Sequence, residues 1–469
     1  MTGLANDTLH DTLLWAPQAW VDGRWQAGVA LRIDAASGLW AEVRPDVPPP
    51  PGTRVLPGPL LPGLVNAHSH AFQRAFAGLA ERREGENDDF WSWRDRMYAV
   101  ALRMSPEALE AVATQLYAEL LQGGYTQVCE FHYLHHAPDG RPYPDPLAMS
   151  HALMRAAGAT GIGLTLLPVL YQRAGFTQPA LREDQRRFAT DVERLLTWRD
   201  SVRAARQPCV NAGVAIHSLR AAPAEAIARL QRALEGDAGP IHLHIAEQTA
   251  EVDDCLAATG RRPIEWLLQN VALDARWQLV HATHATADEI DGVARSGAGV
   301  VICPSTEANL GDGLTDVPRW LGAGTVLSIG SDSHVGRQWP AELKLLEYGQ
   351  RLQLRRRNVA AAPQAQQPAT AARLYQRMLH GGAPAAGFAR WGFEPGARAD
   401  WLVLDLQAPG LLGVPASHAL DALVFATEGL AFVEVGVAGH PVLRDGALPA
   451  QAAIAQRFAA TMAELWAPA

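Results

Sequence analysis

Lysine is almost absent from this sequence, although basic residues are not. Of its 40 lysine and arginine residues, only Lys344 is a lysine, and the other 39 are arginines. This scarcity argues against sites that need lysine, such as Schiff-base lysines, P-loop lysines and carboxylated lysines that bridge two metal ions. The chemistry is therefore expected to depend on His, Asp, Glu, Arg, Cys or a metal ion.

Cysteine, surplus positive charge and long apolar runs are scarce too. The four cysteines form no CxxC pair, which indicates reduced thiols rather than a disulfide framework. The net charge is -9, so no basic surplus is available to neutralise nucleic-acid phosphates. No apolar run approaches the roughly 20 residues of a membrane span, and the N-terminus lacks a signal-peptide pattern. We expect a cytoplasmic protein without nucleic-acid or membrane partners.

Apolar runs alternate with helix-like segments along the middle of the chain. With 469 residues, 48% of them hydrophobic, the chain can bury a large core. Helices are predicted over 107–122, 146–158, 182–205, 222–235, 285–296 and 341–357. The eight apolar runs are LLPGLVNAHSH, YTQVCEFHYLHH, GIGLTLLPVL, VNAGVAIHSLR, IHLHIAE, WQLVHATH, GVVICPST and VLSIGSDSH. This alternation predicts an α/β fold, a (β/α)8 TIM-like barrel whose active site lies at the carboxyl ends of the strands.

The two ends of the chain have a different pattern. Residues 1–60 alternate in polarity as short strands do, and they end near the stiff PPPPG segment. After about residue 385 strand-like runs with turns return, followed by a helix over 451–466. We therefore predict one small β-sandwich built from both termini. Its parts are residues 1–60 and 385–469, the latter with a C-terminal helix, and residues 61–384 form the barrel.

A His-Ser-His motif follows the first apolar run. Residues i and i+2 of a strand face the same side, so His68 and His70 would both point into the barrel mouth. Two convergent imidazoles make half of a zinc site. Taken alone, this motif is more often structural than metal-binding.

Three other strand ends carry residues of the same kind. His244 lies near the end of the fifth run and Asp332 after the eighth, and both are candidate metal ligands. His242, one layer deeper, is interpreted as a hydrogen-bonded interior histidine. Glu247 follows His244 by three residues, in a loop where a carboxylate can transfer protons. His281 ends the sixth run and, with Asp332, could hold and deprotonate a water molecule.

This arrangement of HxH, His, His and Asp at four strand ends resembles the amidohydrolase superfamily. The resemblance implies a metal-dependent barrel flanked by a β-sandwich made from both termini. The HxxE form, without a lysine in the fourth run, looks like the mononuclear deaminase branch. It implies one divalent metal ion, zinc favoured. The implied ligands are His68, His70, His244 and Asp332, and the implied catalytic residues are Glu247, His281 and Asp332.

Several longer segments are more specific. HSHAFQRAFAG, WSWRDRMY, EFHYLHH, HSLRA, HIAEQ and CPSTEANLGDG resemble the formimidoylglutamate deiminases, and the resemblance spans essentially the whole chain. It implies hydrolytic deimination of N-formimino-L-glutamate to N-formyl-L-glutamate and ammonia, in histidine degradation. The residues that it places around the substrate are Gln73, Arg94, Tyr133, His217 and Arg220. Two arginines suit a substrate with two carboxylates. Arg94 is expected in a loop after the first strand, and CPSTEANLGDG as a loop after the seventh.

Two alternatives stay open. The same fold could deaminate an aromatic base such as guanine or an adenosine derivative, in which case stacking aromatics and amide donors should line the pocket. A non-catalytic relative could keep the barrel as an assembly module. If the chain is a formimidoylglutamate deiminase, as the resemblance implies, we expect a homodimer that binds a small dicarboxylate.

Overall fold

The computed structural model describes residues 11–83 and 88–467. The first ten residues lie outside the described residues. They are part of the predicted first sandwich segment and of the N-terminal region that lacks a signal-peptide pattern. Within those residues, no helix is both long enough and apolar enough to cross a membrane.

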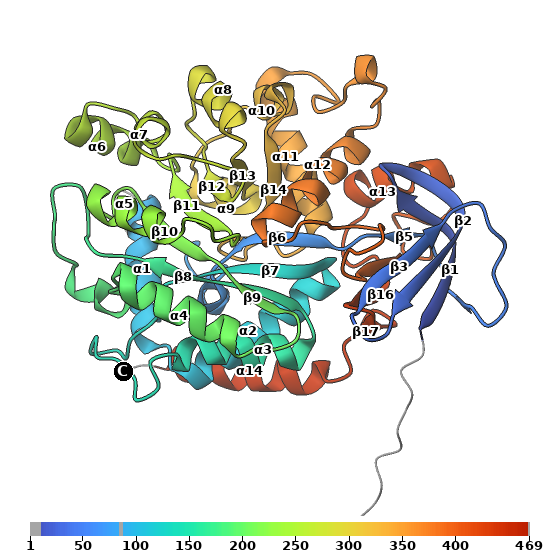
Figure 1. The fold of residues 1–469 in the computed structure, drawn as a ribbon, viewed down its shortest axis with the longest axis horizontal. Coiled ribbons are helices and arrows are strands. Elements are labelled where there is room, and N and C mark those ends of the chain that lie inside the picture. The colour runs from blue at the N-terminus through green and yellow to red at the C-terminus, as the bar shows by residue number, and fades with distance from the viewer. Residues whose placement is uncertain (1–10, 84–87, 468–469) are drawn as a thin grey trace, which may run out of the picture.

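Eight parallel strands form the barrel, in the spatial order β14-β13-β12-β11-β10-β8-β7-β6. A bridge between Ser69 and Asp332 joins the two outer strands and closes the ring. The strands are buried and mostly apolar, as expected for a parallel sheet covered by helices (Figure 1). They are β6 (Leu64–Ser69), β7 (Tyr125–His132), β8 (Gly163–Leu170), β10 (Val214–Ser218), β11 (Ile241–Ile245), β12 (Trp277–His281), β13 (Gly299–Ile302) and β14 (Val326–Ile329), with the short β9 (Val210–Ala212) paired to β8. The prediction of a TIM-like barrel is confirmed.

Helices cover the outside of the barrel (Figure 1). They are α1 (Phe90–Arg103), α2 (Pro106–Gln122), α3 (Ala148–Thr160), α4 (Val192–Ala204), α5 (Ala224–Ala233), α6 (Thr249–Thr259), α7 (Pro263–Asn270), α8 (Ala287–Ser296), α9 (Pro304–Leu310), α10 (Val317–Ala323), α11 (Trp339–Leu354) and α12 (Thr370–Ala385), with 3-10 turns η1 (Ala71–Ala75), η2 (Glu183–Phe188) and η3 (Pro363–Ala365). The prediction of one helix over 182–205 is wrong in one respect, because this segment forms two elements, η2 and α4. Asp191 causes the division, since its side chain caps α4 by accepting a hydrogen bond from the Arg194 N–H.

Two segments that were expected to be loops contain helices. Arg94 lies in α1, where the Asp89 carboxylate accepts hydrogen bonds from the backbone N–H groups of the first turn and Ser92 completes a capping box. The segment CPSTEANLGDG contains α9, which starts at Pro304 and is followed by Gly311, a left-handed C-cap glycine with φ 71°. Both loop predictions are wrong, because these caps stabilise short helices in the two segments.

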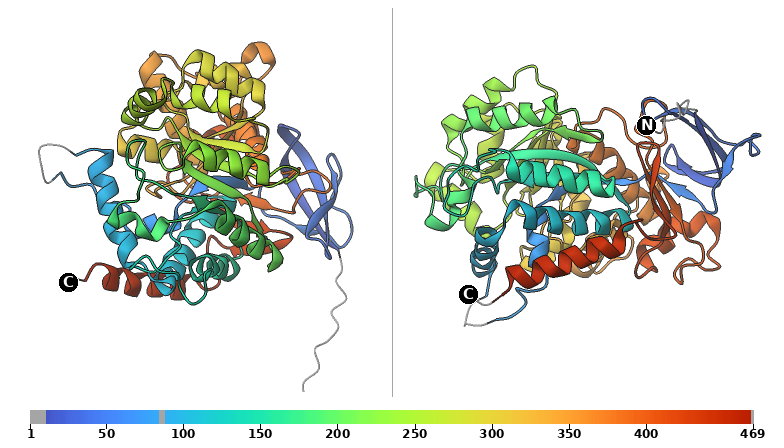
Figure 2. Two further views of the ribbon diagram at one scale, coloured as in Figure 1. Left: turned by 60° about the vertical axis from the view of Figure 1, so that its left-hand side comes forward. Right: turned by 90° about the horizontal axis from the view of Figure 1, so that it is seen from below.

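A second, mixed sheet is built from both ends of the chain, as predicted. Its order is β17-β16-β15-β5-β1-β2-β3, with β4 paired to β1, and the antiparallel pair β5–β15 joins the two ends. Figure 2 shows this sheet to one side of the barrel. Its strands are β1 (Thr12–Val21), β2 (Arg24–Asp34), β3 (Leu39–Arg44), β4 (Arg54–Val55), β5 (Leu60–Leu61), β15 (Trp401–Leu404), β16 (Phe432–Val437) and β17 (His440–Arg444). It has its own core, in which the Trp40 and Phe393 rings pack edge to face at 5.6 Å.

The last elements return to the barrel. They are η4 (Ala416–His418), α13 (Ala419–Phe425) and α14 (Gln451–Leu465). The C-terminal helix α14 packs against α2, as the right-hand view of Figure 2 shows. The chain end thus contacts the barrel beyond the small sheet.

Arg398 joins the barrel to the C-terminal segment. Its side chain is only 8% exposed and pairs with Asp400, at 2.6 Å between Nη2 and Oδ2. The same guanidinium donates to the Gln127 side chain at 2.7 Å and to the Thr126 carbonyl at 3.0 Å, both on β7. This buried cation therefore links two parts of the chain that are about 270 residues apart in sequence.

Replacing Arg398 with Met should destabilise the fold. The Arg398→Met change leaves the Asp400 carboxylate buried without its cation, and such a loss costs about 3–5 kcal/mol. Denaturant-induced unfolding followed by tryptophan fluorescence measures the change. Arg141→Met is the control, since the Arg141 side chain is 86% exposed. Equal unfolding midpoints for the two variants would contradict the role assigned to Arg398.

Candidate active site

The seam between the first and last barrel strands brings three candidate metal ligands together. The Asp332 N–H donates to the His68 carbonyl at 3.0 Å, and the His70 N–H donates to the Asp332 carbonyl at 3.3 Å. These bonds set Asp332 beside the two histidines of the HxH motif, although the residues are more than 260 positions apart in sequence. The closure of the barrel thus assembles this part of the site.

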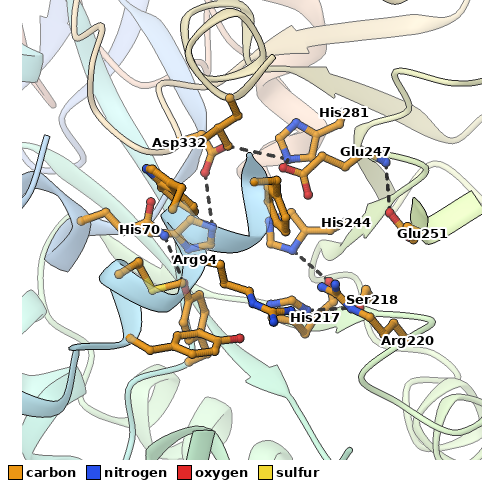
Figure 3. Close-up of a pocket in the computed structure, with 17 residues that line it drawn as sticks. His70, Arg94, His217, Ser218, Arg220, His244, Glu247, Glu251, His281 and Asp332 are labelled. Atoms are coloured by element: carbon orange, nitrogen blue, oxygen red, sulfur yellow. Dashed lines mark hydrogen bonds and ion pairs between the residues drawn. The ribbon is translucent and has the colours of Figure 1, made fainter. Parts of the chain in front are cut away.

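Four side chains converge at the carboxyl end of the barrel. The His68 Nε2 atom lies 3.1 Å from His70 Nε2 and 2.9 Å from His244 Nε2. One Asp332 oxygen, Oδ1, lies 3.5 Å from His68 Nε2 and 3.4 Å from His70 Nε2. All four residues are less than 8% exposed. Figure 3 shows His70, His244 and Asp332 around one end of a cavity.

The hydrogen bonds of the histidine Nδ1 atoms, which face away from the cluster, determine what the Nε2 atoms inside the cluster can bind. His70 Nδ1 donates to the Phe131 carbonyl at 2.9 Å, and His244 Nδ1 donates to the His217 carbonyl at 2.9 Å. With Nδ1 protonated in a neutral ring, Nε2 presents a lone pair to the cluster. Lone pairs that face one another next to a carboxylate suit a cation. Ligand atoms that all lie within 4.8 Å of one another form two overlapping groups here, His68–His70–Asp332 and His68–His244–His281. Imidazole nitrogens and a carboxylate oxygen suit a divalent metal such as zinc.

The other Asp332 oxygen faces a second group of titratable side chains. His281 Nε2 lies 3.7 Å from Asp332 Oδ2 and 3.7 Å from Glu247 Oε1, while its Nδ1 lies 3.3 Å from Glu307 Oε1. Burial raises the pKa of Glu247 to about 7. Burial opposes charge on the His281 ring, but the surrounding carboxylates, Glu247 first, raise its pKa to about 10. Proton acceptors and donors therefore meet at one point beside the four-residue cluster.

The backbone at these strand ends adopts an uncommon conformation. Residues with positive φ cluster here: Ala246 (51°), His281 (71°), Ala282 (49°), Asp332 (47°) and His334 (65°). Non-glycine residues rarely occupy this left-handed region, and they do so where the surrounding structure holds them. The strain coincides with the turns that follow β11, β12 and β14.

Two arginines form the other end of the cavity. The guanidiniums of Arg94 and Arg220 both lie over the Trp91 ring, with Cζ 4.5 and 5.4 Å from its centroid. The only carboxylate near Arg94 is the half-exposed Asp95, at 3.8 Å, and the Arg94 Nε is buried without a hydrogen-bond partner among the described residues. Within the same residues, Arg220 has no carboxylate at ion-pair distance. Burial lowers the pKa of Arg94, and the nearby charge of Arg220 adds to this effect. These guanidiniums can therefore accept anionic groups of a ligand.

The remaining predicted residues lie between these two ends. Gln73 Nε2 donates to the Tyr133 hydroxyl at 3.1 Å, and the Gln73 Oε1 atom is buried without a partner in the described part of the chain. The His217 ring lies 5.2 Å from the His244 ring and 5.7 Å from the Tyr133 ring. All predicted site residues except His68 line one cavity, in which about 50 Å³ is open to water-sized groups.

Sequence reasoning missed several residues of the cavity wall. Trp93, Met97 and Tyr98 come from α1, and Glu251 comes from α6. Spacing was a usable signal for Tyr98, which lies one helical turn after the predicted residue Arg94 in α1. Glu251 lies in the first turn of α6, and Glu247 precedes that helix. His242 lies deeper, as predicted, and donates to the Ala385 carbonyl at 2.8 Å.

Comparisons with known proteins show the family to which this chain belongs. The model of the Amidohydrolase family matches residues 60–442. A formimidoylglutamate deiminase of Pseudomonas aeruginosa is 46% identical over 453 residues, covering 96% of this chain and 99% of the relative. A 5-methylthioadenosine/S-adenosylhomocysteine deaminase of Nitratidesulfovibrio vulgaris is 29% identical over 394 residues, covering 82% and 80% of the two chains.

Solved structures show the same architecture. An amidohydrolase of Brucella melitensis superposes with a TM-score of 0.91 at 39% identity, covering 97% of this chain and all of the other. An adenosine deaminase of Xanthomonas campestris with bound zinc superposes with a TM-score of 0.79 at 23% identity, covering 97% and 98% of the two chains. By its family match and its 46% identical relative, this chain belongs to the amidohydrolase family.

Proposed function

We propose that this chain hydrolyses N-formimino-L-glutamate to N-formyl-L-glutamate and ammonia, the deimination step of histidine degradation. The observation that carries the proposal is the pair of guanidiniums, Arg94 and Arg220, at the far end of the cavity from the histidine and carboxylate cluster. A ligand with two carboxylates at one end and a reactive amidine at the other matches this division. The 46% identical relative, named formimidoylglutamate deiminase, supports the same substrate.

We assign one divalent metal ion, zinc favoured, to His68, His70, His244 and Asp332. When bound, a zinc ion polarises the reacting group and lowers the pKa of water from 15.7 toward about 7. The three inward imidazole nitrogens and the Asp332 Oδ1 atom are the groups of this chain that would hold it. The protein is proposed to act as a homodimer in the cytoplasm, and light scattering tests the first of these expectations.

The residues beside the metal ligands carry the proton transfers. The Asp332 Oδ2 atom accepts a proton from the attacking water as the water oxygen bonds to the formimino carbon, and His281 Nε2, 3.7 Å from that oxygen, holds the water in place. Glu247, 3.7 Å from the same ring nitrogen, delivers a proton to the departing nitrogen. The carbon–nitrogen bond then breaks with ammonia rather than its anion as the leaving group.

The arginine end of the cavity selects the substrate. Arg94 and Arg220 bind the two carboxylates, because guanidinium N–H groups pair with carboxylate oxygens in charge-assisted hydrogen bonds. Gln73, Tyr133 and His217 line the path between the two ends and orient the substrate. A neutral purine would leave both guanidiniums without an anion, which disfavours the aromatic-base alternative.

The purified protein is expected to contain one equivalent of metal, and His244→Asn should lose it. His242→Asn is the matched control, since His242 lies on the same strand but binds the Ala385 carbonyl. Elemental analysis of the two variants and the wild type gives the metal content. Two metal ions per chain, or equal metal content in the two variants, would contradict the assigned ligands.

Glu247→Gln should lower kcat on the order of 10²–10⁴-fold, because the amide cannot carry a proton to the leaving nitrogen. Metal content should stay at the wild-type level. Ammonia release from N-formimino-L-glutamate measures kcat, and Asp253→Asn, at an exposed position of α6, serves as the control. A Glu247→Gln variant with wild-type kcat would remove Glu247 from the mechanism.

Arg94→Met and Arg220→Met should each lower kcat/KM by roughly 10- to 150-fold, since a charge-assisted hydrogen bond contributes about 1.5–3 kcal/mol. Arg103→Met is the control on the same helix as Arg94, where the side chain binds the Leu465 carbonyl instead. Metal content should not change in any variant. The substrate assignment fails if both cavity variants keep wild-type kcat/KM, or if the wild type prefers guanine or adenosine.

A further inference from the structure

A row of buried polar side chains lies behind the metal-ligand cluster, on the side away from the cavity. None of its members lines the cavity. Each is at most 2% exposed, and each is hydrogen-bonded to the next. The members, in order, are Asn66, Ser331, His334, Ser69 and Glu130, and we call this row the Asn66–Glu130 chain.

The hydrogen bonds of the Asn66–Glu130 chain all run in one direction. Asn66 Nδ2 donates to Ser331 Oγ at 2.7 Å. Ser69 Oγ donates to Glu130 Oε2 at 2.6 Å, so its contact with His334 Nε2 at 3.3 Å must be one in which the imidazole donates. His334 Nδ1 is then the acceptor for the Ser331 hydroxyl at 3.0 Å. Donor counting thus assigns the Nε2–H tautomer to His334.

The chain ends at a carboxylate that lacks a cation. Glu130 is 2% exposed, and no ion pair of the described residues includes it. It accepts from the Ala71 N–H at 2.6 Å and from the Tyr117 hydroxyl at 3.3 Å, besides Ser69. A buried carboxylate is costly unless hydrogen bonds replace its hydration. Glu130 therefore binds both neighbours of His70, the side-chain hydroxyl of Ser69 and the backbone N–H of Ala71.

Every member from Asn66 to Ser69 is adjacent or nearly adjacent to an assigned ligand. Ser69 separates His68 from His70, and Ser331 precedes Asp332. His334 follows Asp332 by two residues, and both have left-handed backbones, with φ of 65° and 47°. Side chains alternate along a strand, so Ser69 points away from the cavity while its two neighbours point in. The chain spans the barrel seam and holds both sides of it from behind.

We propose that the Asn66–Glu130 chain is a positioning network that keeps the ligands of β6 and of the β14 end in register. Ser69 and Glu130 act through His68, His70 and Asp332 and do not touch the substrate. Mutation of residues that hydrogen-bond to metal ligands commonly lowers metal affinity by about 10- to 100-fold. Breaking the network should therefore weaken metal binding. The inference rests on the metal centre of the proposed function.

The test compares two variants that each break a hydrogen bond of the Asn66–Glu130 chain with a control variant that removes a buried hydroxyl outside it. Ser69→Ala removes the hydroxyl between His334 and Glu130, and Glu130→Gln replaces the terminal carboxylate with an amide of the same shape. Thr165→Val is the control, because Thr165 Oγ1 is fully buried on β8 and bonds to Gln127 and the Ala386 carbonyl. Zinc affinity is measured by competition with a chelating indicator, and thermal stability is measured on the metal-free proteins.

We expect the zinc Kd to rise about 10- to 100-fold in Ser69→Ala and Glu130→Gln and to stay unchanged in Thr165→Val. All three should lose some thermal stability, since each loses a buried hydrogen bond. With zinc saturating, the first two should show a lower kcat and an unchanged KM. If their zinc Kd equals that of Thr165→Val, the inference is overturned, whichever substrate the enzyme prefers. If the wild type binds zinc but does not hydrolyse N-formimino-L-glutamate, the proposed substrate fails while the zinc comparison still decides the network.

A spectroscopic measurement tests the direction of the chain without substrate. In ¹⁵N-histidine-labelled protein, the signal missing from His334→Phe identifies His334. A hydrogen on Nε2 is expected for the zinc-loaded wild type at neutral pH. A hydrogen on Nδ1 would contradict the chain as described, because Ser69 would then have no donor at His334.

Discussion

The site depends on how the first and last strands of the barrel meet. Two backbone hydrogen bonds, from Asp332 N–H to the His68 carbonyl and from His70 N–H to the Asp332 carbonyl, join them at the ligand positions. A slip of one residue in this register would turn the two histidines away from the cavity, because side chains alternate along a strand. Closing the barrel and bringing these candidate metal ligands together are thus one structural event.

This closure is costly for the local backbone. The turns after β12 and β14 contain His281, Asp332 and His334 in left-handed conformations, and such residues carry strain of about 1–3 kcal/mol each. Strained residues persist only where their surroundings hold them. Here the carboxylate of Glu307 holds His281 by its outer nitrogen, and Ser331 and Ser69 hold the ring of His334. Buried hydrogen bonds and an ion pair therefore hold these left-handed residues from behind the cavity.

Much of the fold and of the cavity could be predicted because the signals are local. Buried parallel strands are continuous apolar runs, and their polar ends mark the active face of a barrel. Helix α1 was missed because its segment, rich in aromatic residues, depends on the Asp89 cap and on burial of Phe90 and Tyr98. The hydrogen-bond partners of Ser69 could not be predicted from the sequence for another reason. Glu130 is 61 positions away along the chain and His334 is 265 positions away. Only the closed barrel brings them together.

The near absence of lysine has a physical consequence at the substrate end. A guanidinium is flat, so Arg94 and Arg220 can stack on Trp91 and keep their in-plane N–H groups for a ligand. A lysine ammonium has no such face, and its strongly hydrated charge would tolerate burial less well. Stacking lets the protein hold two cations in one cavity without neutralising them with its own carboxylates. Two carboxylates of the cavity, Glu247 and Asp332, each have an oxygen 3.7 Å from His281 Nε2. Within the described residues, Arg220 has no carboxylate at ion-pair distance and Arg94 has only Asp95, so both guanidiniums can pair with an anionic ligand in the cavity that also holds the carboxylates around His281.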